Sequence, residues 1–427
     1  MEPWVLVLTV PRKNRKMSNT PISSFDQLAL CNPLRKALSG LGYQIPTPVQ
    51  AAAIPPLLEG RDLLGCSQTG TGKTAAFALP ILQKFSANRK RPARCSTRAL
   101  VLTPTRELAV QISESFRDYG RYVGLKQVVI YGGVGMHPQI RACTNGVDVV
   151  VATPGRLLDL IGRGYLRLDS LEVFVLDEAD RMLDMGFLPD IKRLLTLIPQ
   201  KRQSLFFSAT MPPTIATLAD SILTDPVKIQ ISPAATPVER IDQRVLFVSQ
   251  TDKRALLGEV LKDDLTDRVL VFTRTKHGAD RVVAQLVDVK VRAEAIHGNK
   301  SQNARQKALN NFRNGHTRVL VATDIASRGI DVEGITHVIN YDLPNEPESY
   351  VHRIGRTARA GNDGIAISFC APKEKSYLRD IERLIHQSVP VQDTRTYGVS
   401  GYAPRGRSKP VPQRANRGHG RRRMAAA

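Results

Sequence analysis

Two short segments of the chain hold residue types that together can bind and cleave a nucleoside triphosphate. The first, Ser67-Gln68-Thr69-Gly70-Thr71-Gly72-Lys73-Thr74, fits the Walker A pattern except that Ser67 replaces its first glycine. Its glycines allow backbone N–H groups to surround a phosphate, while Lys73 would reach the β- and γ-phosphates and Thr74 would bind Mg²⁺. The segment predicts a phosphate-binding loop, with a ligand-free turn rich in Gly and Thr as the alternative.

The second segment is Leu171–Asp180, LEVFVLDEAD, in which a hydrophobic run ends in acidic residues. This is the Walker B arrangement, and we expect Asp177 to hold the Mg²⁺ ion. Glu178 is then placed to orient or deprotonate the attacking water. The alternative, two surface acids that cap the next helix, is disfavoured because a Walker A segment precedes them.

Buried strands are needed to position these residues, and short apolar runs alternate with helical patterns along the chain. Continuous runs of Val, Ile and Leu between helices are typical of parallel strands buried on both faces. The runs form two sets, which predicts an α/β fold of two tandem doubly wound parallel-sheet domains. The first set is Ala99–Leu102, Gln127–Ile130, Asp148–Ala152, Val173–Leu176 and Ser204–Phe207, and the second is Arg244–Val248, Val269–Phe272, Arg292–Ile296, Val319–Val321, His337–Asn340 and Ile365–Phe369.

Three of these strands end in threonine immediately before a helix. They are LVLTPT at Leu100–Thr105, VVVATP at Val149–Pro154 and VLVATD at Val319–Asp324. In open α/β sheets, ligands bind at the carboxyl ends of the strands. Helix N-termini at the same edge present free N–H groups, which suit phosphates.

The length of 427 residues predicts two or three domains, at about 150 residues each. We expect a disordered N-terminal extension over 1–20, a first domain over 21–231 that binds ATP, and a linker over 232–240. A second domain would span 241–390, followed by a disordered basic tail over 391–427. The 42% share of hydrophobic residues excludes a wholly disordered chain.

The tail has a composition that cannot bury enough apolar surface to fold. An RNA-binding tail, using phosphate contacts and some stacking on Tyr397 and Tyr402, is the favoured interpretation, and a solubilising tail is the alternative. From Thr394 to Ala427 it has no acidic residue and nine basic ones: Arg395, Arg405, Arg407, Lys409, Arg414, Arg417, Arg421, Arg422 and Arg423.

Charge is the unusual feature of the composition. The chain has 61 Lys and Arg against 39 Asp and Glu, a net charge of +22. Such an excess favours polyanionic partners, with nucleic acid ahead of acidic membrane surfaces. No apolar stretch approaches the roughly 18 residues of a membrane span, so we predict no membrane association.

The cysteines and the N-terminus favour a cytoplasmic location. None of the five cysteines forms a CxxC pair, so neither a disulfide framework nor a zinc site is expected. The first residues place their basic side chains after the apolar run Trp4–Val10, which is not the pattern of a secretion signal. Met17 would make an ordinary start, and residues 1–16 are interpreted as an upstream extension.

The chain closely resembles the DEAD-box RNA helicases over about Phe25 to Ile385. Asp177–Asp180 is the motif that names this family, and the other motifs occur in the family order. The compact core with a short basic tail resembles the bacterial RhlE-type subgroup. The remaining motifs are GYQIPTPVQ at Gly42–Gln50, SQTGTGKT, PTRELA at Pro104–Ala109, Gly132-Gly133, TPGR at Thr153–Arg156, Ser208-Ala209-Thr210, VFT at Val271–Thr273, QNAR at Gln302–Arg305, ATDIASRGID at Ala322–Asp331 and HRIGRTAR at His352–Arg359.

The resemblance implies how two RecA-like domains would share one ATP. Phe25 and Tyr43 would surround the adenine, Gln50 would read its edge, and Asp331 would contact the ribose. Without the resemblance, the first three would be interpreted as core residues. Arg356 and Arg359 would act as arginine fingers on the γ-phosphate. Because these arginines lie in the second half, the site would be complete only when the halves close.

The resemblance also implies an RNA path across both halves that does not read base sequence. Some of the residues named for it, such as Arg106, are alternatively interpreted as pairing with neighbours within the fold. The positions near the RNA backbone would be Pro104, Thr105, Arg106, Gly133, Thr153, Arg156, Thr323 and Arg328, and those coupling nucleotide state to closure would be Asp180, Ser208, Thr210 and His352.

The function expected from these residues is an ATP-dependent RNA helicase that separates short duplexes locally. The alternative is a nucleotide-gated RNA clamp or chaperone with little unwinding, and a DNA translocase is disfavoured. We expect ATP and Mg²⁺ as cofactors and single-stranded or short duplex RNA as the partner. A monomeric chain is expected, with ribosomal or RNA-decay proteins as possible partners.

Overall fold

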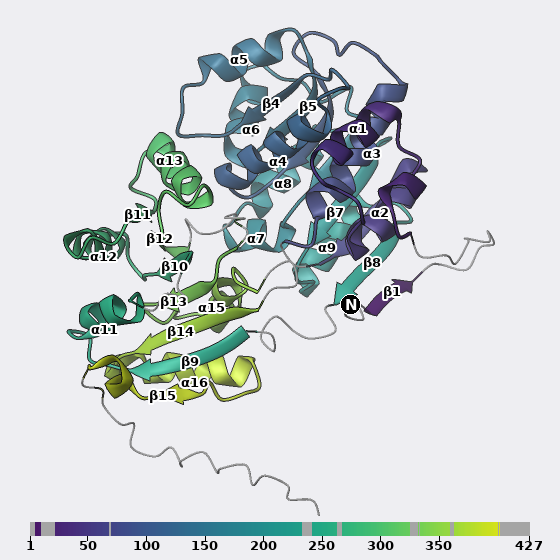
Figure 1. The fold of residues 1–427 in the computed structure, drawn as a ribbon. Helices are drawn as coiled ribbons and strands as arrows, with labels where there is room; N and C mark the ends of the chain where they lie inside the picture. Colours follow the sequence, from purple (N-terminus) through teal and green to yellow (C-terminus); the bar gives the residue numbers. More distant parts are fainter. Residues whose placement is uncertain are drawn as a thin grey trace, which may run out of the picture.

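The computed structural model of the chain describes residues 5–9, 22–67, 70–232, 241–262, 267–324, 332, 334–358, 363–399 and 401. They form two α/β lobes, each built on its own sheet (Figure 1). Lobe 1 comprises β1 and residues 22–232, and lobe 2 comprises the described residues from 241 onward. The predicted fold of two tandem parallel-sheet domains is therefore confirmed.

Lobe 1 contains an eight-stranded sheet in the order β1-β8-β2-β7-β6-β3-β5-β4. All of its strand pairs are parallel except β1 with β8. The strands are β1 Val5–Thr9, β2 Leu63–Cys66, β3 Thr97–Leu102, β4 Gln127–Ile130, β5 Val147–Ala152, β6 Val173–Leu176, β7 Gln203–Ser208 and β8 Val227–Ser232.

Helices cover both faces of this sheet, which explains why its central strands are apolar throughout. One face packs against α1 Asn32–Gly40, α2 Pro48–Leu58, α3 Lys73–Ala87 and α4 Arg106–Tyr119, and the other against α5 His137–Thr144, α6 Pro154–Gly162, α7 Ala179–Asp184, α8 Leu188–Leu195 and α9 Pro213–Ile222.

Lobe 2 repeats this architecture with a seven-stranded parallel sheet in the order β11-β12-β10-β13-β14-β9-β15. Its strands are β9 Ile241–Phe247, β10 Val269–Phe272, β11 Ala293–Ile296, β12 Val319–Ala322, β13 His337–Asn340, β14 Gly364–Cys370 and β15 Val391–Gln392. Its helices include α11 Lys253–Val260, α12 Lys276–Asp288, α13 Gln302–Arg313, α15 Pro347–Ile354 and α16 Lys375–Leu384. Among the described residues, no helix is both long and apolar enough to cross a membrane.

The N-terminal segment differs from the disorder expected over residues 1–20. Val5–Thr9 forms β1, whose residues pair antiparallel with Thr9 opposite Lys228 and Val5 opposite Ser232. The run VLVLT is rich in strand-forming residues, and the outer edge of β8 offers it unpaired backbone groups. The rest of residues 1–20 lies outside the described residues, as do residues 233–240 of the expected linker.

The start of the predicted disordered tail is also folded. Residues 391–401, which we call the C-terminal strap, begin with β15 on the edge of β9 and end with a bridge between Gly401 and Val248. Thr394 and Val399 in the strap are only 3% and 8% exposed. The strap packs on lobe 2, so residues 391–399 and 401 differ from the disorder expected of them.

The strap predicts a difference between two truncated chains. A chain that ends at Tyr402 keeps the contacts of Thr394 and Val399, whereas a chain that ends at Asp393 loses them. Because burying a Val side chain contributes about 1.5–3 kcal/mol, the shorter chain should unfold at least about 3 °C lower. Thermal unfolding of both chains and the full chain measures this. Equal midpoints for all three would contradict a folded strap.

Candidate active site at the interface of the two lobes

The phosphate-binding loop connects β2 to the first residue of α3. Lys73 is buried, and its Nζ donates to the carbonyl oxygen of Ser67 at 2.9 Å. Gly72 has a φ of 88°, and a Cβ there would lie 2.5 Å from Nε2 of Gln50. Glycine is therefore required at 72 both by backbone conformation and by the closeness of Gln50. Gln68 and Thr69 lie outside the described residues.

Gln50 holds this loop against the start of α2. Its Nε2 donates to the carbonyl of Gly72 at 3.2 Å, and its Oε1 accepts from the backbone N–H of Thr47 at 2.9 Å. The Thr47 hydroxyl donates to the carbonyl of Thr71 at 2.8 Å. The amide that was expected to read adenine thus connects a helix cap to the phosphate loop.

Phe25 and Tyr43, the aromatic pair expected around adenine, lie together with ring centroids 5.8 Å apart. Phe25 is 4% exposed and belongs to the core of lobe 1, whereas Tyr43 is half-buried. The hydroxyls of Tyr43 and Tyr119 lie 3.0 Å apart, and burial raises the pKa of Tyr119. The two tyrosines, Tyr43 and Tyr119, therefore connect the loop before α2 to the end of α4.

Three buried carboxylates follow β6. Asp177, Glu178 and Asp180 are 3%, 3% and 8% exposed. Burial raises the pKa of Asp177, and Lys73 opposes this rise. Glu178 has a left-handed backbone, with φ 54° and ψ 51°, at the point where the strand turns into α7.

Glu178 is paired within its own helix turn. Its Oε2 lies 3.0 Å from Nη1 of Arg181, and the side chains are 4% and 8% exposed. Its Oε1 is buried and has no hydrogen-bond partner among the described residues. Arg181 was not predicted as a site residue, because a basic residue at this helical position usually faces solvent.

Asp180 joins the acidic segment to the loop after β7. Its Oδ2 accepts from the backbone N–H of Ala209 at 3.1 Å and from that of Thr210 at 3.0 Å, and from the Thr210 hydroxyl at 3.2 Å. The Ser208 hydroxyl accepts from the backbone N–H of Asp180 at 3.3 Å. The structure thus brings together three of the four residues expected to couple nucleotide state to closure.

His352, the fourth of these residues, approaches the group from lobe 2. Burial lowers its pKa, and the positive charges of Arg181 and Arg356 lower it further. The acidic groups Asp180 and Asp184 of lobe 1 act in the opposite direction. The charged residues of α7 therefore face those of α15 across the interface.

Arg356 is 3% exposed beside this interface, whereas Arg359 and Asp331 lie outside the described residues. Arg353, which was not predicted as a site residue, binds residues at the ends of two lobe 2 strands. Its guanidinium binds both carboxylate oxygens of Asp324 and donates to the side chain of Asn340 at 3.1 Å. The lobe 2 motifs after β12 and β13 are thereby fixed relative to α15.

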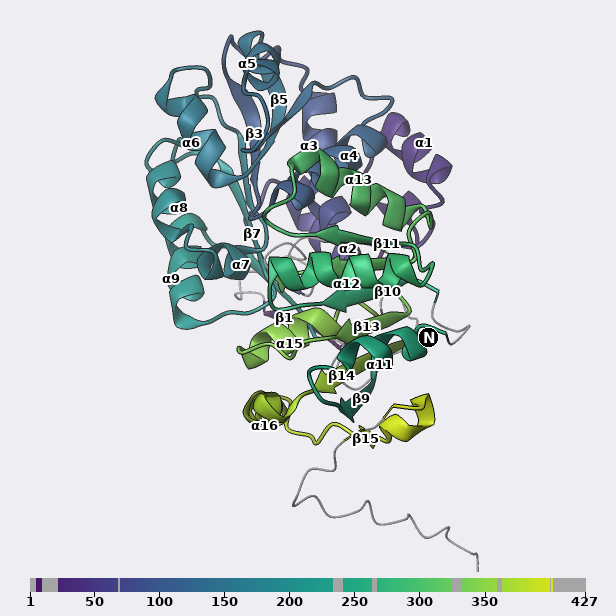
Figure 2. The same cartoon turned by 90° about the vertical axis from the view of Figure 1, so that its left-hand side faces the viewer.

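The lobes meet directly through Glu107, near the start of α4. Its Oε1 accepts from Nε2 of Gln302 at 3.0 Å and from Nη2 of Arg305 at 2.9 Å, both on α13. Arg106 Nη1 donates to Oε1 of Gln302 at 3.4 Å. Arg106, for which pairing with neighbours within the fold was the alternative, thus binds lobe 2, as Glu107 does. Figure 2 shows the two helices that carry these residues, with α13 of lobe 2 beside α4 of lobe 1.

Most of the residues expected near RNA gather at one edge of the lobe 1 sheet. Thr105 and Thr153 cap α4 and α6 at the carboxyl ends of the neighbouring strands β3 and β5. Gly133 follows β4, and a Cβ there would collide with the guanidinium of Arg106. Arg156 donates to the carbonyl of Val134 at 3.3 Å. Pro104 is buried, Thr323 follows β12 in lobe 2, and Arg328 lies outside the described residues.

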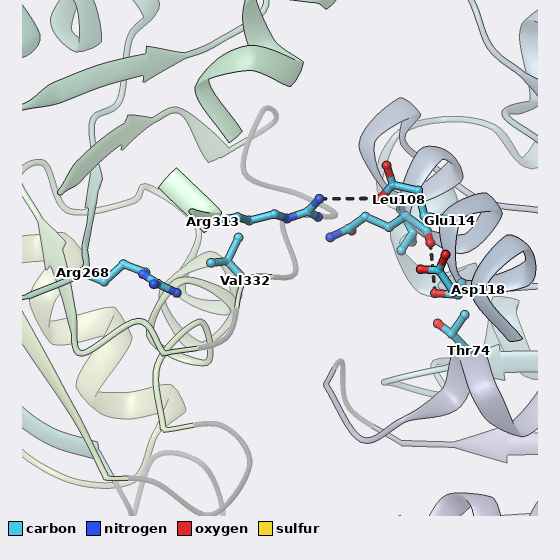
Figure 3. Close-up of a pocket in the computed structure, with 9 residues that line it drawn as sticks. Thr74, Leu108, Glu114, Asp118, Arg268, Arg313 and Val332 are labelled. Carbon is cyan, nitrogen blue, oxygen red and sulfur yellow. Dashed lines mark hydrogen bonds and ion pairs between the residues drawn. The ribbon is translucent and has the colours of Figure 1, made fainter. Parts of the chain in front are cut away.

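A cavity of about 490 Å³ lies between α4 and lobe 2, with Thr74 at its border (Figure 3). Thr74 borders it from α3, and Arg268, Arg313 and Val332 border it from lobe 2. Its volume lies within the range of small-molecule sites. The remaining lining residues are Leu108, Gln111, Glu114, Ser115 and Asp118 of α4.

Comparison with known proteins decides the family. Residues 47–218 match the DEAD/DEAH box helicase family and residues 252–361 match the helicase conserved C-terminal domain. The chain belongs to the DEAD-box RNA helicases. It is 43% identical to the DEAD-box ATP-dependent RNA helicase CshA of Bacillus subtilis over 360 residues, which cover 84% of this chain and 72% of CshA. The CshA of Bacillus cereus is 42% identical over 375 residues, 88% of this chain and 70% of CshA.

Solved structures match the chain over both lobes. Dbp5 of S. cerevisiae, bound to RNA and ADP BeF3, has a TM-score of 0.75 at 31% identity, covering 88% of this chain and 97% of Dbp5. A DEAD box protein from Methanococcus jannaschii has a TM-score of 0.52 at 38% identity, with 87% and 99% covered. The RhlE-type subgroup expected from the tail is not supported, because these bacterial relatives carry the name CshA.

The bonding of Asp180 predicts a loss of stability in Asp180→Asn. The other carboxylate oxygen, Oδ1, accepts from the backbone N–H of Arg181 at 3.1 Å, so in either orientation the amide would turn its NH2 group toward a donor, which should cost roughly 2–3 kcal/mol. The unfolding midpoint of lobe 1 should fall by at least about 4 °C. Asp184→Asn is the matched control, since Asp184 is an exposed carboxylate of the same helix. Equal midpoints for the two variants would refute this account of Asp180.

Proposed function

We propose that this chain is an ATP-dependent RNA helicase whose nucleotide site is completed when the two lobes close on RNA. The observation that carries the proposal is the division of the site. Lys73 and the buried carboxylates lie in lobe 1, while lobe 2 contributes the buried Arg356 and also His352, which is within electrostatic reach of Asp180. The family and the names of its relatives support helicase activity over the clamp or chaperone alternative.

The roles of Lys73 and Glu178 follow from the Walker segments, and the other roles are those that the family resemblance implies. Lys73 binds the β- and γ-phosphates, and Glu178 orients or deprotonates the attacking water. Arg356 and Arg359 neutralise charge that develops on the γ-phosphate. Phe25, Tyr43 and Gln50 hold the adenine, and Asp331 contacts the ribose. The Oε1 atom of Glu178 supports this role, because the buried acceptor has no hydrogen-bond partner within the part of the chain that the structure describes.

Mg²⁺ fits the donor set at the phosphate loop. The Thr74 hydroxyl borders the cavity and Asp177 is a buried carboxylate, both of which are oxygen ligands suited to a hard cation. When bound with ATP, Mg²⁺ neutralises phosphate charge. Deprotonated Asp177 is the form that binds a cation, so its raised pKa opposes Mg²⁺ binding in acid.

RNA would bind along the edge formed by Thr105, Gly133 and Thr153 and continue to Thr323 of lobe 2. Helix starts and backbone N–H groups at this edge suit phosphates and sugars, so binding should be independent of sequence. Dbp5, which matches the chain over both lobes, is bound to RNA in two of its structures.

Coupling to closure runs through Asp180, Ser208, Thr210 and His352. Ribosomal or RNA-decay partners, a monomeric state and a cytoplasmic location stay predictions from the sequence.

Two assays on the purified chain test the proposal. Single-stranded RNA should stimulate ATP hydrolysis, and ATP should release a strand from a short RNA duplex whereas a non-hydrolysable analogue should not sustain repeated release. ATP hydrolysis that is equally fast with and without RNA would refute the function. Stimulated hydrolysis without strand release would favour the clamp alternative.

Glu178→Gln should trap a closed complex with ATP and RNA. The amide keeps the size of the side chain but cannot accept a proton, so turnover should fall by at least about 100-fold. Labelled RNA should dissociate more slowly in the presence of ATP than it does from the wild type. Glu59→Gln is the matched control, because Glu59 is exposed at the end of α2. Undiminished turnover in Glu178→Gln would exclude the assigned role.

The basic tail after the strap should strengthen RNA binding through phosphate contacts. Removing residues 403–427 deletes eight of the nine basic residues but leaves the strap intact. Each lost contact should reduce the slope of log affinity against log salt by about 0.7 on single strands. Hydrolysis at saturating RNA should hardly change. An unaltered slope, measured by RNA titration at several salt concentrations, would show that the tail does not touch RNA.

A further inference from the structure

The α4 helix of lobe 1 and the α13 helix of lobe 2 contact each other at two positions along their lengths, which we call levels. At the first level, Glu107 is bound by Gln302 and Arg305. At the second, Nη1 of Arg313 lies 3.9 Å from Oε2 of Glu114. The close-up of the cavity shows Arg313 extending from lobe 2 toward this carboxylate (Figure 3).

Helix geometry explains why these two levels coexist. Glu114 is seven residues after Glu107 on α4, and Arg313 is eight residues after Arg305 on α13. Two helical turns take about 7.2 residues, so each pair of positions lies on one face of its helix. Two acidic positions on one helix thus lie opposite two basic positions on the other.

The two levels differ in exposure to solvent. The Glu107 and Arg305 side chains are 2% and 12% exposed, whereas those of Glu114 and Arg313 are 40% and 22% exposed. The second pair lies at the rim of the cavity that Thr74 of the phosphate loop also borders. Asp118 of α4 and Arg268 of lobe 2 line the same cavity, so charges of opposite sign face each other across it.

We propose that Glu114 and Arg313 form a rim latch, a second contact between the lobes that strengthens closure on nucleotide and RNA. The inference rests on the proposed function, because closure is what the latch would favour. Glu114 and Arg313 are positioning residues, since they act on the relative position of the lobes and not on the reacting atoms. The latch should weaken as salt rises, because exposed ion pairs are screened.

The test measures how strongly nucleotide and RNA binding are coupled. The affinity of a labelled single-stranded RNA is determined with and without a saturating non-hydrolysable ATP analogue, and the ratio of the two affinities is the coupling ratio. At about 50 mM KCl, Arg313→Glu and Glu114→Arg should each lower this ratio about fivefold. At about 300 mM KCl the loss should shrink to less than about twofold. The double variant Glu114→Arg/Arg313→Glu restores opposite charges and should return to within about twofold of the wild type.

Lys307→Glu is the matched control, because Lys307 is an exposed residue of α13 and its substitution changes the net charge as Arg313→Glu does. Its coupling ratio should equal that of the wild type. An equal loss in Lys307→Glu, or a double variant that shows both losses, would overturn the latch. A wild-type ratio of one would refute the proposed function itself. A wild-type ratio above one with unchanged single variants would refute the latch alone.

Discussion

Three carboxylates kept from water at the end of β6 constrain the rest of the site. Burying ionised groups is strongly unfavourable unless each is paired or hydrogen-bonded. Here Lys73 lies near Asp177, Arg181 pairs with Glu178, and Asp180 is bound by the loop after β7. The phosphate loop, the acidic strand end and the loop after β7 therefore cannot rearrange independently. In the described ranges of the chain, one buried oxygen of Glu178 has no partner, which leaves it available to the attacking water.

The same constraint explains why lobe 2 presents cations to the cluster. Arg181 and Arg356 both disfavour a proton on His352, so positive groups from the two lobes lie within electrostatic reach of one another. Asp180 and Asp184 oppose this effect on His352, and the phosphates of ATP would add further negative charge beside the cations of both lobes, but only in the closed state. A ligand shifts a conformational equilibrium only through such a difference in affinity between states. ATP should therefore favour closure mainly through its phosphates.

The sequence predicted the buried central strands and the site motifs, because continuous apolar runs and the Walker segments depend on neighbouring residues only. It missed β8, VKIQIS, whose alternating pattern is typical of a half-buried strand, and the strap, whose only strongly buried apolar residue is Val399. It also missed Arg181 and the contacts of Glu107 with α13, since these partners depend on tertiary packing. Gln302 and Arg305 belong to the QNAR motif, but no neighbouring residue in the sequence indicated that they bind the other lobe.

The α4 helix connects the regions proposed to bind RNA and ATP. Thr105, on the edge proposed for RNA, caps its start, and the helix ends at Tyr119, whose hydroxyl lies against Tyr43 on the adenine side. Between these ends, Glu107 and Glu114 bind α13 of the other lobe. A helix transmits displacement along its length because its backbone hydrogen bonds resist bending. Any shift of α13 on α4 therefore alters both ligand sites together, and by reciprocity each ligand must alter the affinity for the other.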